Sequence, residues 1–62
     1  MLIIVDTNDN HAAVKLLDFY GASISLEKGV VEICYEDVDQ IPSICRILVA
    51  ENIEILQIYK SE

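Results

Sequence analysis

Five consecutive polar residues, Asp6-Thr7-Asn8-Asp9-Asn10, place oxygen-bearing side chains at alternate positions, as the start of a calcium-binding loop does. Such a loop also needs a glycine for its sharp turn and a bidentate glutamate to close the site. This chain has His11 and Leu17 at those two places. We therefore interpret residues 6–10 as a strand-to-helix connection that contains a helix-capping residue, and we predict no metal site.

His11 is the sole histidine, and no nucleophile motif stands near it. A general base needs a partner within hydrogen-bond reach, and a metal site needs more than one ligand of this kind. Cys34 and Cys45 lack the Cys-x-x-Cys spacing of a copper-carrying domain, and we expect both to stay reduced as small hydrophobic residues. We therefore predict no catalytic, cofactor-binding or metal-binding residue, and no enzyme activity in this chain.

Residues 28–35 begin with Lys-Gly, as does a motif of the RNA-recognition domain that stacks two outward-facing aromatic side chains on bases. Val30 and Glu32 occupy those two aromatic positions here. The chain also has a formal net charge of −7 and only 4 lysines and arginines, so it has few groups to neutralise phosphates. We predict no nucleic-acid partner.

The 62 residues are 53% hydrophobic, which is enough apolar surface for one small folded domain spanning residues 1–62. No apolar run approaches the roughly 20 residues that a membrane-spanning helix needs. We therefore expect no direct membrane insertion and a cytoplasmic location. A domain this small is marginally stable unless a partner contributes buried surface.

Two helices and four strands are predicted from the periodicity of apolar residues. Residues 1–5 form a β-branched strand, Asn8 or Asp9 caps a first helix, and Gly21 ends that helix. Pro42 suits the first turn of a second helix because its missing N–H needs no partner there. That helix stops near Asn52, which tolerates the left-handed conformation, and residues 53–60 form the last strand.

Between the helices, the apolar period changes to two, which indicates a hairpin that turns at Lys28-Gly29. A two-residue loop at this point would set Leu26 opposite Val31 and Ile24 opposite Ile33. The order strand, helix, strand, strand, helix, strand then predicts an α+β fold, the ferredoxin-like sandwich. We expect a four-stranded antiparallel sheet in the order 4-1-3-2, with both helices on one face and the other face open.

The first strand is apolar at every position, so whichever of the pairs Leu2/Ile4 and Ile3/Val5 packs under the helices, the other lies on the open face. A central strand that is apolar on both sides usually has a layer packed on each side. We therefore predict an interface on the open face, made by Ile3, Val5, Val30 and Cys34.

Structural residues distributed over nearly the whole chain carry a family resemblance. These are Ala13, Leu16-Leu17 and Gly21; Ser25 and Gly29-Val30-Val31-Glu32-Ile33; Glu36-Asp37, Ile41-Pro42, Ile44, Arg46 and Leu48-Val49; and Asn52-Ile53. The chain resembles the small C-terminal domain that follows the ATPase core in bacterial ABC transporter ATP-binding subunits for drug, bacteriocin or lantibiotic export and immunity. Cys45 and Asn52 replace residues often found in that pattern. Ser61-Glu62 resembles the start of a further helix, so the chain looks like an excised domain.

This resemblance implies a non-catalytic accessory or regulatory domain that packs on the ATPase core or on a second copy, at the cytoplasmic side of the membrane. ATP and Mg²⁺ would bind in the upstream part of the parent, and the membrane permease would be an indirect partner. The alternative is an ACT-like regulatory module, which has the same order of elements and binds amino acids near the first strand-to-helix loop. Residues 6–10 would supply its polar contacts.

Overall fold

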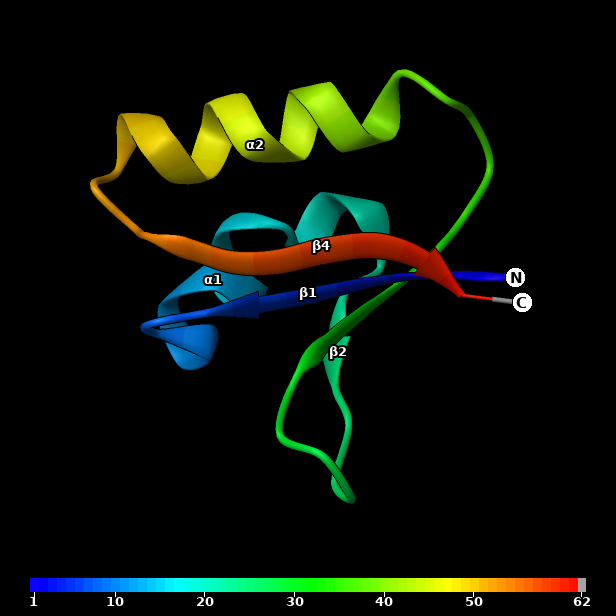
Figure 1. The fold of residues 1–62 in the computed structure, drawn as a ribbon, viewed down its shortest axis with the longest axis horizontal. Helices are drawn as coiled ribbons and strands as arrows, with labels where there is room; N and C mark the ends of the chain where they lie inside the picture. The colour runs from blue at the N-terminus through cyan, green and yellow to red at the C-terminus, as the bar shows by residue number, and fades with distance from the viewer. Residues whose placement is uncertain (62) are drawn as a thin grey trace.

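Four antiparallel strands and two α-helices make up the fold in a computed structural model, which describes residues 1–61 (Figure 1). The elements follow the chain in the order β1 (Leu2–Thr7), α1 (Asn10–Leu16), the 3-10 turn η1 (Asp18–Tyr20), β2 (Ser23–Ile24), β3 (Val31–Cys34), α2 (Gln40–Ala50) and β4 (Ile55–Ser61). The strands are arranged as β2-β3-β1-β4. This confirms the predicted α+β class and the predicted strand order, 4-1-3-2 when read from the other edge.

β1 is one of the two inner strands and pairs with β3 on one side and β4 on the other. Its first residue, Leu2, lies between Cys34 and Ser61, so the start of the chain runs beside the end of β4 (Figure 1). α1 packs against β1, β2 and β3, whereas α2 packs against β4 and α1. Each helix therefore covers its own half of the sheet.

The hydrophobic core lies between the sheet and the two helices. From the sheet come the odd-numbered residues of the two inner strands, Ile3, Val5, Val31 and Ile33, all fully buried. From the helices and their ends come Ala13, Leu17, Ile44, Leu48 and Ile53. Because neighbouring residues of a strand point to opposite faces, the even-numbered residues of β1 and β3 lie on the uncovered face.

This arrangement corrects the prediction for the first strand. Ile3 and Val5 were expected on the open face, but both have 0% exposure and pack beneath the helices. The reason is the pairing with β3: Ile3 lies opposite Ile33 and Val5 opposite Val31. Glu32 lies between those two residues of β3, and its carboxylate is far less costly on the solvent side.

The predicted hairpin register is also wrong, by two residues. Ile24 pairs with Val31 rather than with Ile33. Ser25 N donates to Val30 O at 2.8 Å, and Gly29 N donates back to Ser25 O at 2.8 Å, so residues 26–29 form a four-residue loop. A shift of two keeps every side chain on its expected face but moves Leu26 from the strand into the loop, where it is fully exposed.

The ends of the helices follow the expected local chemistry. Asp9 caps α1, since its side chain accepts a hydrogen bond from Ala12 N at 3.2 Å. α1 ends at Leu16, earlier than predicted, and Gly21 instead ends the η1 turn with a φ of 76°. Asn52 follows α2 with a φ of 60°, which confirms its predicted left-handed conformation.

Candidate docking face

The uncovered face of the sheet, called the open face from here on, consists of three cross-strand rows. The central row runs Ser23, Glu32, Ile4, Tyr59, and it is flanked by the row Cys34, Leu2, Ser61 and by the pair Asp6, Gln57. Side chains directly opposite one another in a sheet share a face. The open face is therefore apolar near its centre and polar around it.

The apolar part of the open face is partly accessible. Leu2 is 37% exposed and Tyr59 46% exposed, and Cys34 is also exposed. Ile4 is only 9% exposed, because it lies between the long side chains of Glu32 and Tyr59. Such a surface suits contact with another protein better than a purely polar sheet face would.

Of the four predicted interface residues, Cys34 lies on the open face, whereas Ile3 and Val5 lie in the core. Val30 is half-buried and precedes β3 with the same parity as Glu32 and Cys34. Sequence reasoning missed Tyr59, and the polar residues that interrupt the apolar surface. The alternation of Val31 and Ile33 with Glu32 was the available signal, since it marks the solvent side of β3.

The polar residues of the β1–α1 connection bond to the protein itself. Asn8 N donates to Glu54 O, and Glu54 N donates to the Asn8 side chain, each at 3.1 Å. Asp9 N donates to Thr7 Oγ1 at 3.0 Å, in addition to the cap that Asp9 provides. These contacts extend the β1–β4 ladder past Thr7 and fix the connection between the two elements.

Asn10 is the centre of this network. Its Oδ1 accepts hydrogen bonds from Thr7 N and Thr7 Oγ1, each at 2.8 Å. Its Nδ2 donates to Asp6 Oδ1 at 3.0 Å and to Gly29 O at 2.9 Å. The last contact ties the connection after β1 to the hairpin loop 26–29. The sequence pattern that resembled a calcium loop is thus a structural link between two loops.

Two hollows are lined by carboxylates. One lies between the start of α1 and the end of α2 and is lined by Asn8, Asp9, Ala12, Lys15, Leu16, Glu51, Asn52 and Ile53. The other lies between the η1 turn and α2 and is lined by Tyr20, Glu36, Asp37, Asp39, Gln40 and Ser43. The first combines a lysine with two carboxylates, and the second has three carboxylates. The first hollow adjoins the connection where an ACT-like ligand was expected.

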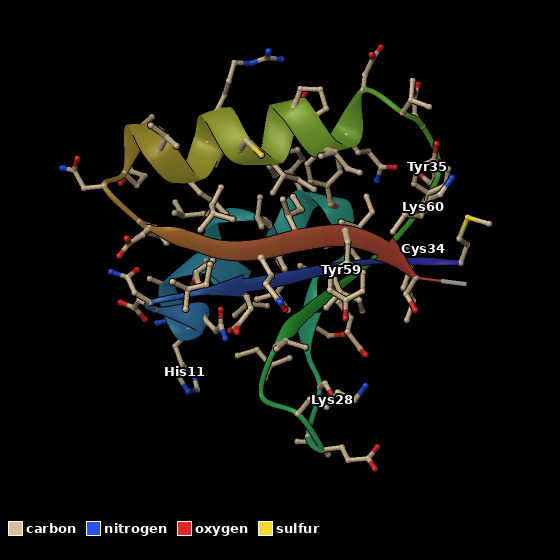
Figure 2. The ribbon with its side chains drawn as sticks, in the orientation of Figure 1. His11, Lys28, Cys34, Tyr35, Tyr59 and Lys60 are labelled. Atoms are coloured by element: carbon tan, nitrogen blue, oxygen red, sulfur yellow. The ribbon has the colours of Figure 1, made fainter. Side chains whose placement is uncertain are left out.

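The remaining candidate residues are well separated. Figure 2 shows His11 at the start of α1, away from the other labelled side chains. Cys34 and Cys45 are free thiols on β3 and α2. Within residues 1–61, no group of three or more His, Cys, Asp or Glu side chains is arranged to hold a metal ion. In that same part of the chain, no helix is long and apolar enough to cross a membrane.

Lys60 and Tyr35 close one end of the fold. The Lys60 Nζ lies 4.7 Å from the centre of the Tyr35 ring, an attractive cation–π distance, and Figure 2 shows the two side chains next to each other.

Comparison of the chain with models of known families, with curated proteins and with solved structures finds no match.

Proposed function

We propose that this chain is a non-catalytic accessory domain that docks through its open face onto a larger partner. The observation that carries the proposal is the central row of that face, where Ile4 and Tyr59 form an apolar centre on a sheet side that no helix within residues 1–61 covers. Leu2 and Cys34 extend this apolar centre along the first row. Covering it would remove exposed apolar area from water, at about 25 cal/mol per Å².

The family resemblance supplies the partner in this proposal. The chain is a C-terminal domain of an ABC exporter ATP-binding subunit, and its open face packs on the ATPase core of the parent or of the dimer mate. ATP and Mg²⁺ bind in that core, and the domain contacts the permease only indirectly. The location that follows is the cytoplasmic side of the membrane.

The test is a titration of the isotope-labelled chain with the ATPase core of an exporter subunit of this class, followed by NMR. We expect shifts of the resonances of Leu2, Ile4 and Cys34 and loss of binding in the variant Leu2→Lys. The matched control is His11→Ala, a change at an exposed residue outside the face. Shifts confined to the helices, or equal binding by Leu2→Lys, would contradict the proposal. The reading frame gives a separate check, since it should encode a phosphate-binding loop roughly 200 residues upstream.

The hollow beside the β1–α1 connection supports a second candidate, an ACT-like module that binds an amino acid. Lys15 can pair with the carboxylate of a free amino acid, and Asp9 or Glu51 with its ammonium group. The test is a panel of thermal unfolding curves with the twenty common amino acids. A ligand at 100 times its dissociation constant adds about 2.7 kcal/mol of stability, which raises the melting temperature. A flat panel would remove this candidate.

A further inference from the structure

β4 forms one edge of the sheet, and no other strand of residues 1–61 lies on its outer side. It is 7 residues long, whereas β2 at the opposite edge has 2. A long uncovered edge presents a row of N–H and C=O groups that another strand can pair with. β4 is therefore the main strand-pairing surface of the molecule.

The hydrogen-bond alternation of the sheet shows which groups of β4 point outward. Tyr35 N donates to Met1 O at 3.1 Å, so odd-numbered residues of β1 bond to β3 and even-numbered ones bond to β4. Tyr59 lies opposite an even-numbered residue of β1 and bonds inward. Ile58 and Lys60, on either side of Tyr59, therefore direct their N–H and C=O groups toward the outside.

We infer that two copies of this chain associate through β4, antiparallel about a two-fold axis at Tyr59, and extend the four-stranded sheet to eight strands. In this register, Ile58 exchanges both backbone hydrogen bonds with Lys60 of the second copy, and each outward group of these residues is paired. The two Tyr59 side chains lie opposite each other on the open face. Gln57 lies opposite Ser61 of the second copy, which ends the ladder before the bulge between Gln57 and Ile55.

The charges at this edge permit the pairing. A lysine on an edge strand normally discourages association, but the Lys60 Nζ lies over the Tyr35 ring, on the β3 side and away from the outer edge. The chain carries a formal net charge of −7, which opposes contact between two copies over most of the surface. β4 itself contains no carboxylate. Two copies can therefore pair along β4 without acidic residues of that strand facing each other.

The flank of α2 beside this edge is made of three uncharged residues, and Arg46 adjoins two of them, Cys45 and Val49, in one hollow. Ile41, Cys45 and Val49 are four residues apart and share one side of the helix. The opposite side carries Ser43, which lines a hollow with Tyr20 of the η1 turn and so faces the α1 half of the fold. The flank of Ile41, Cys45 and Val49 is therefore on the β4 side, and Val49 is 65% exposed.

The spacing of the elements brings the two flanks into contact. Two helices about 10 Å apart, centred over four strands about 4.8 Å apart, leave each helix axis about 2 Å inside its edge strand. Pairing of two β4 edges then sets the two α2 axes about 9 Å apart, a normal packing distance for helices. A lone peptide strand would pair with the outward N–H and C=O groups of β4 but would leave the α2 flank exposed to solvent. A second copy covers both, and we therefore infer a second copy as the partner.

The position of the two-fold axis along α2 is also consistent with contact between the two flanks. Gln40 Nε2 donates to Cys34 O, and Cys34 shares a row with Ser61, so α2 begins at the level of Ser61. Tyr59 is about 7 Å further along β4, which corresponds to four or five helical residues. Cys45 therefore lies close to the axis, and Ile41 lies near Val49 of the second copy.

The first experiment measures the mass of the 62-residue chain by analytical ultracentrifugation. We expect the mass to rise from 7.0 kDa toward twice that value as the protein concentration increases from about 10 μM to 1 mM. The reason is that one short strand pair and one helix flank per copy make a small interface, at the low end of the stable range. Lys60→Pro removes one outward N–H without touching the β1–β4 ladder and should stay at 7.0 kDa. Lys60→Ala keeps that N–H and should associate like the natural chain.

The second experiment tests the register by cross-linking in a background where Cys34 and Cys45 are replaced by serine. Tyr59→Cys should form a disulfide-linked dimer on oxidation, because directly opposed residues of a non-hydrogen-bonded pair lie about 4.5 Å apart between Cα atoms. Gln57→Cys lies on the same face, but the two copies of residue 57 would be about 13 Å apart, so it should not cross-link.

A chain that remains at 7.0 kDa up to 1 mM would overturn the inference, as would association of Lys60→Pro equal to that of Lys60→Ala. Loss of association in Leu2→Lys with retention in Lys60→Pro would also overturn it, because the open face would then be the contact. Circular dichroism of each variant distinguishes lost association from lost folding. The inference does not depend on the proposed function, since the β4 edge and the open face are tested by different variants.

Discussion

Replacement of Asn10 by alanine tests whether the polar segment after β1 is a structural link. The change removes four hydrogen bonds, to Thr7 N, Thr7 Oγ1, Asp6 Oδ1 and Gly29 O. A net hydrogen bond contributes about 0.5–1.5 kcal/mol, and the site is only half-buried, so water replaces part of each contact. At the low end of that range, the four contacts together amount to about 2 kcal/mol.

A loss of this size is large for a chain of 62 residues, whose total stability should be about 3–9 kcal/mol. The unfolding entropy is about 0.13 kcal/mol per kelvin for this length, so the melting temperature should fall by about 15 °C. Urea denaturation followed by circular dichroism measures the free energy, and hydrogen exchange of the Thr7 amide measures the local effect.

His11→Ala is the matched control for Asn10→Ala. It lies one residue further along α1, is exposed, and gains the same helix propensity from alanine. We expect it to change the free energy of unfolding by no more than about 0.5 kcal/mol. If Asn10→Ala lowers the free energy of unfolding by less than about 0.5 kcal/mol, or leaves the exchange rate of the Thr7 amide unchanged, the segment is not a structural link.

Three further substitutions test the core and the connections between elements. Gln40→Leu keeps the side-chain volume but removes the hydrogen bonds that Oε1 accepts from Glu36 N and Asp37 N and the one that Nε2 donates to Cys34 O. Urea denaturation should show that the free energy of unfolding falls by about 2 kcal/mol. An unchanged free energy would contradict a stabilising role for these hydrogen bonds. Leu48→Ala empties a fully buried position and should cost about 2–5 kcal/mol, enough to leave part of the chain unfolded by circular dichroism at 37 °C. Gly21→Ala forces a side chain onto a φ of 76° and should cost about 1 kcal/mol, with melting temperature as the measurement; an unchanged value would show that the η1 turn relaxes.

The order of elements was predictable because it depends on local signals. The period of two in residues 22–34 and the helix-ending conformation of Asn52 are set by residues close in sequence. The hairpin loop was harder, since Lys28-Gly29 fits a two-residue turn as a sequence. The contact from Asn10 Nδ2 to Gly29 O, which spans 19 positions, fixes the longer loop instead. No local pattern contains that contact.

The composition of the open face depended on a pairing that the sequence does not specify. β1 is apolar on both sides from Leu2 to Val5, so its own pattern is compatible with either orientation. The choice is made by β3, where Val31 and Ile33 flank Glu32, and by the register that joins β3 to β1. Residues far apart in the chain thus decide which side of β1 remains uncovered, and the prediction of Ile3 and Val5 as interface residues was corrected there.

The two proposed surfaces reinforce each other. Pairing of the β4 edges places the open faces of two copies on the same side of one continuous sheet, with the two Tyr59 side chains at its centre. A partner that contacts both halves then binds the second half as an intramolecular event, which raises its apparent affinity without any new contact. Because of this coupling, Lys60→Pro should weaken docking onto a two-fold symmetric partner, such as an ATPase dimer, although Lys60 lies outside the open face. Docking onto a monomeric core should be unchanged by the same variant, and equal effects on both partners would show that the two surfaces act independently.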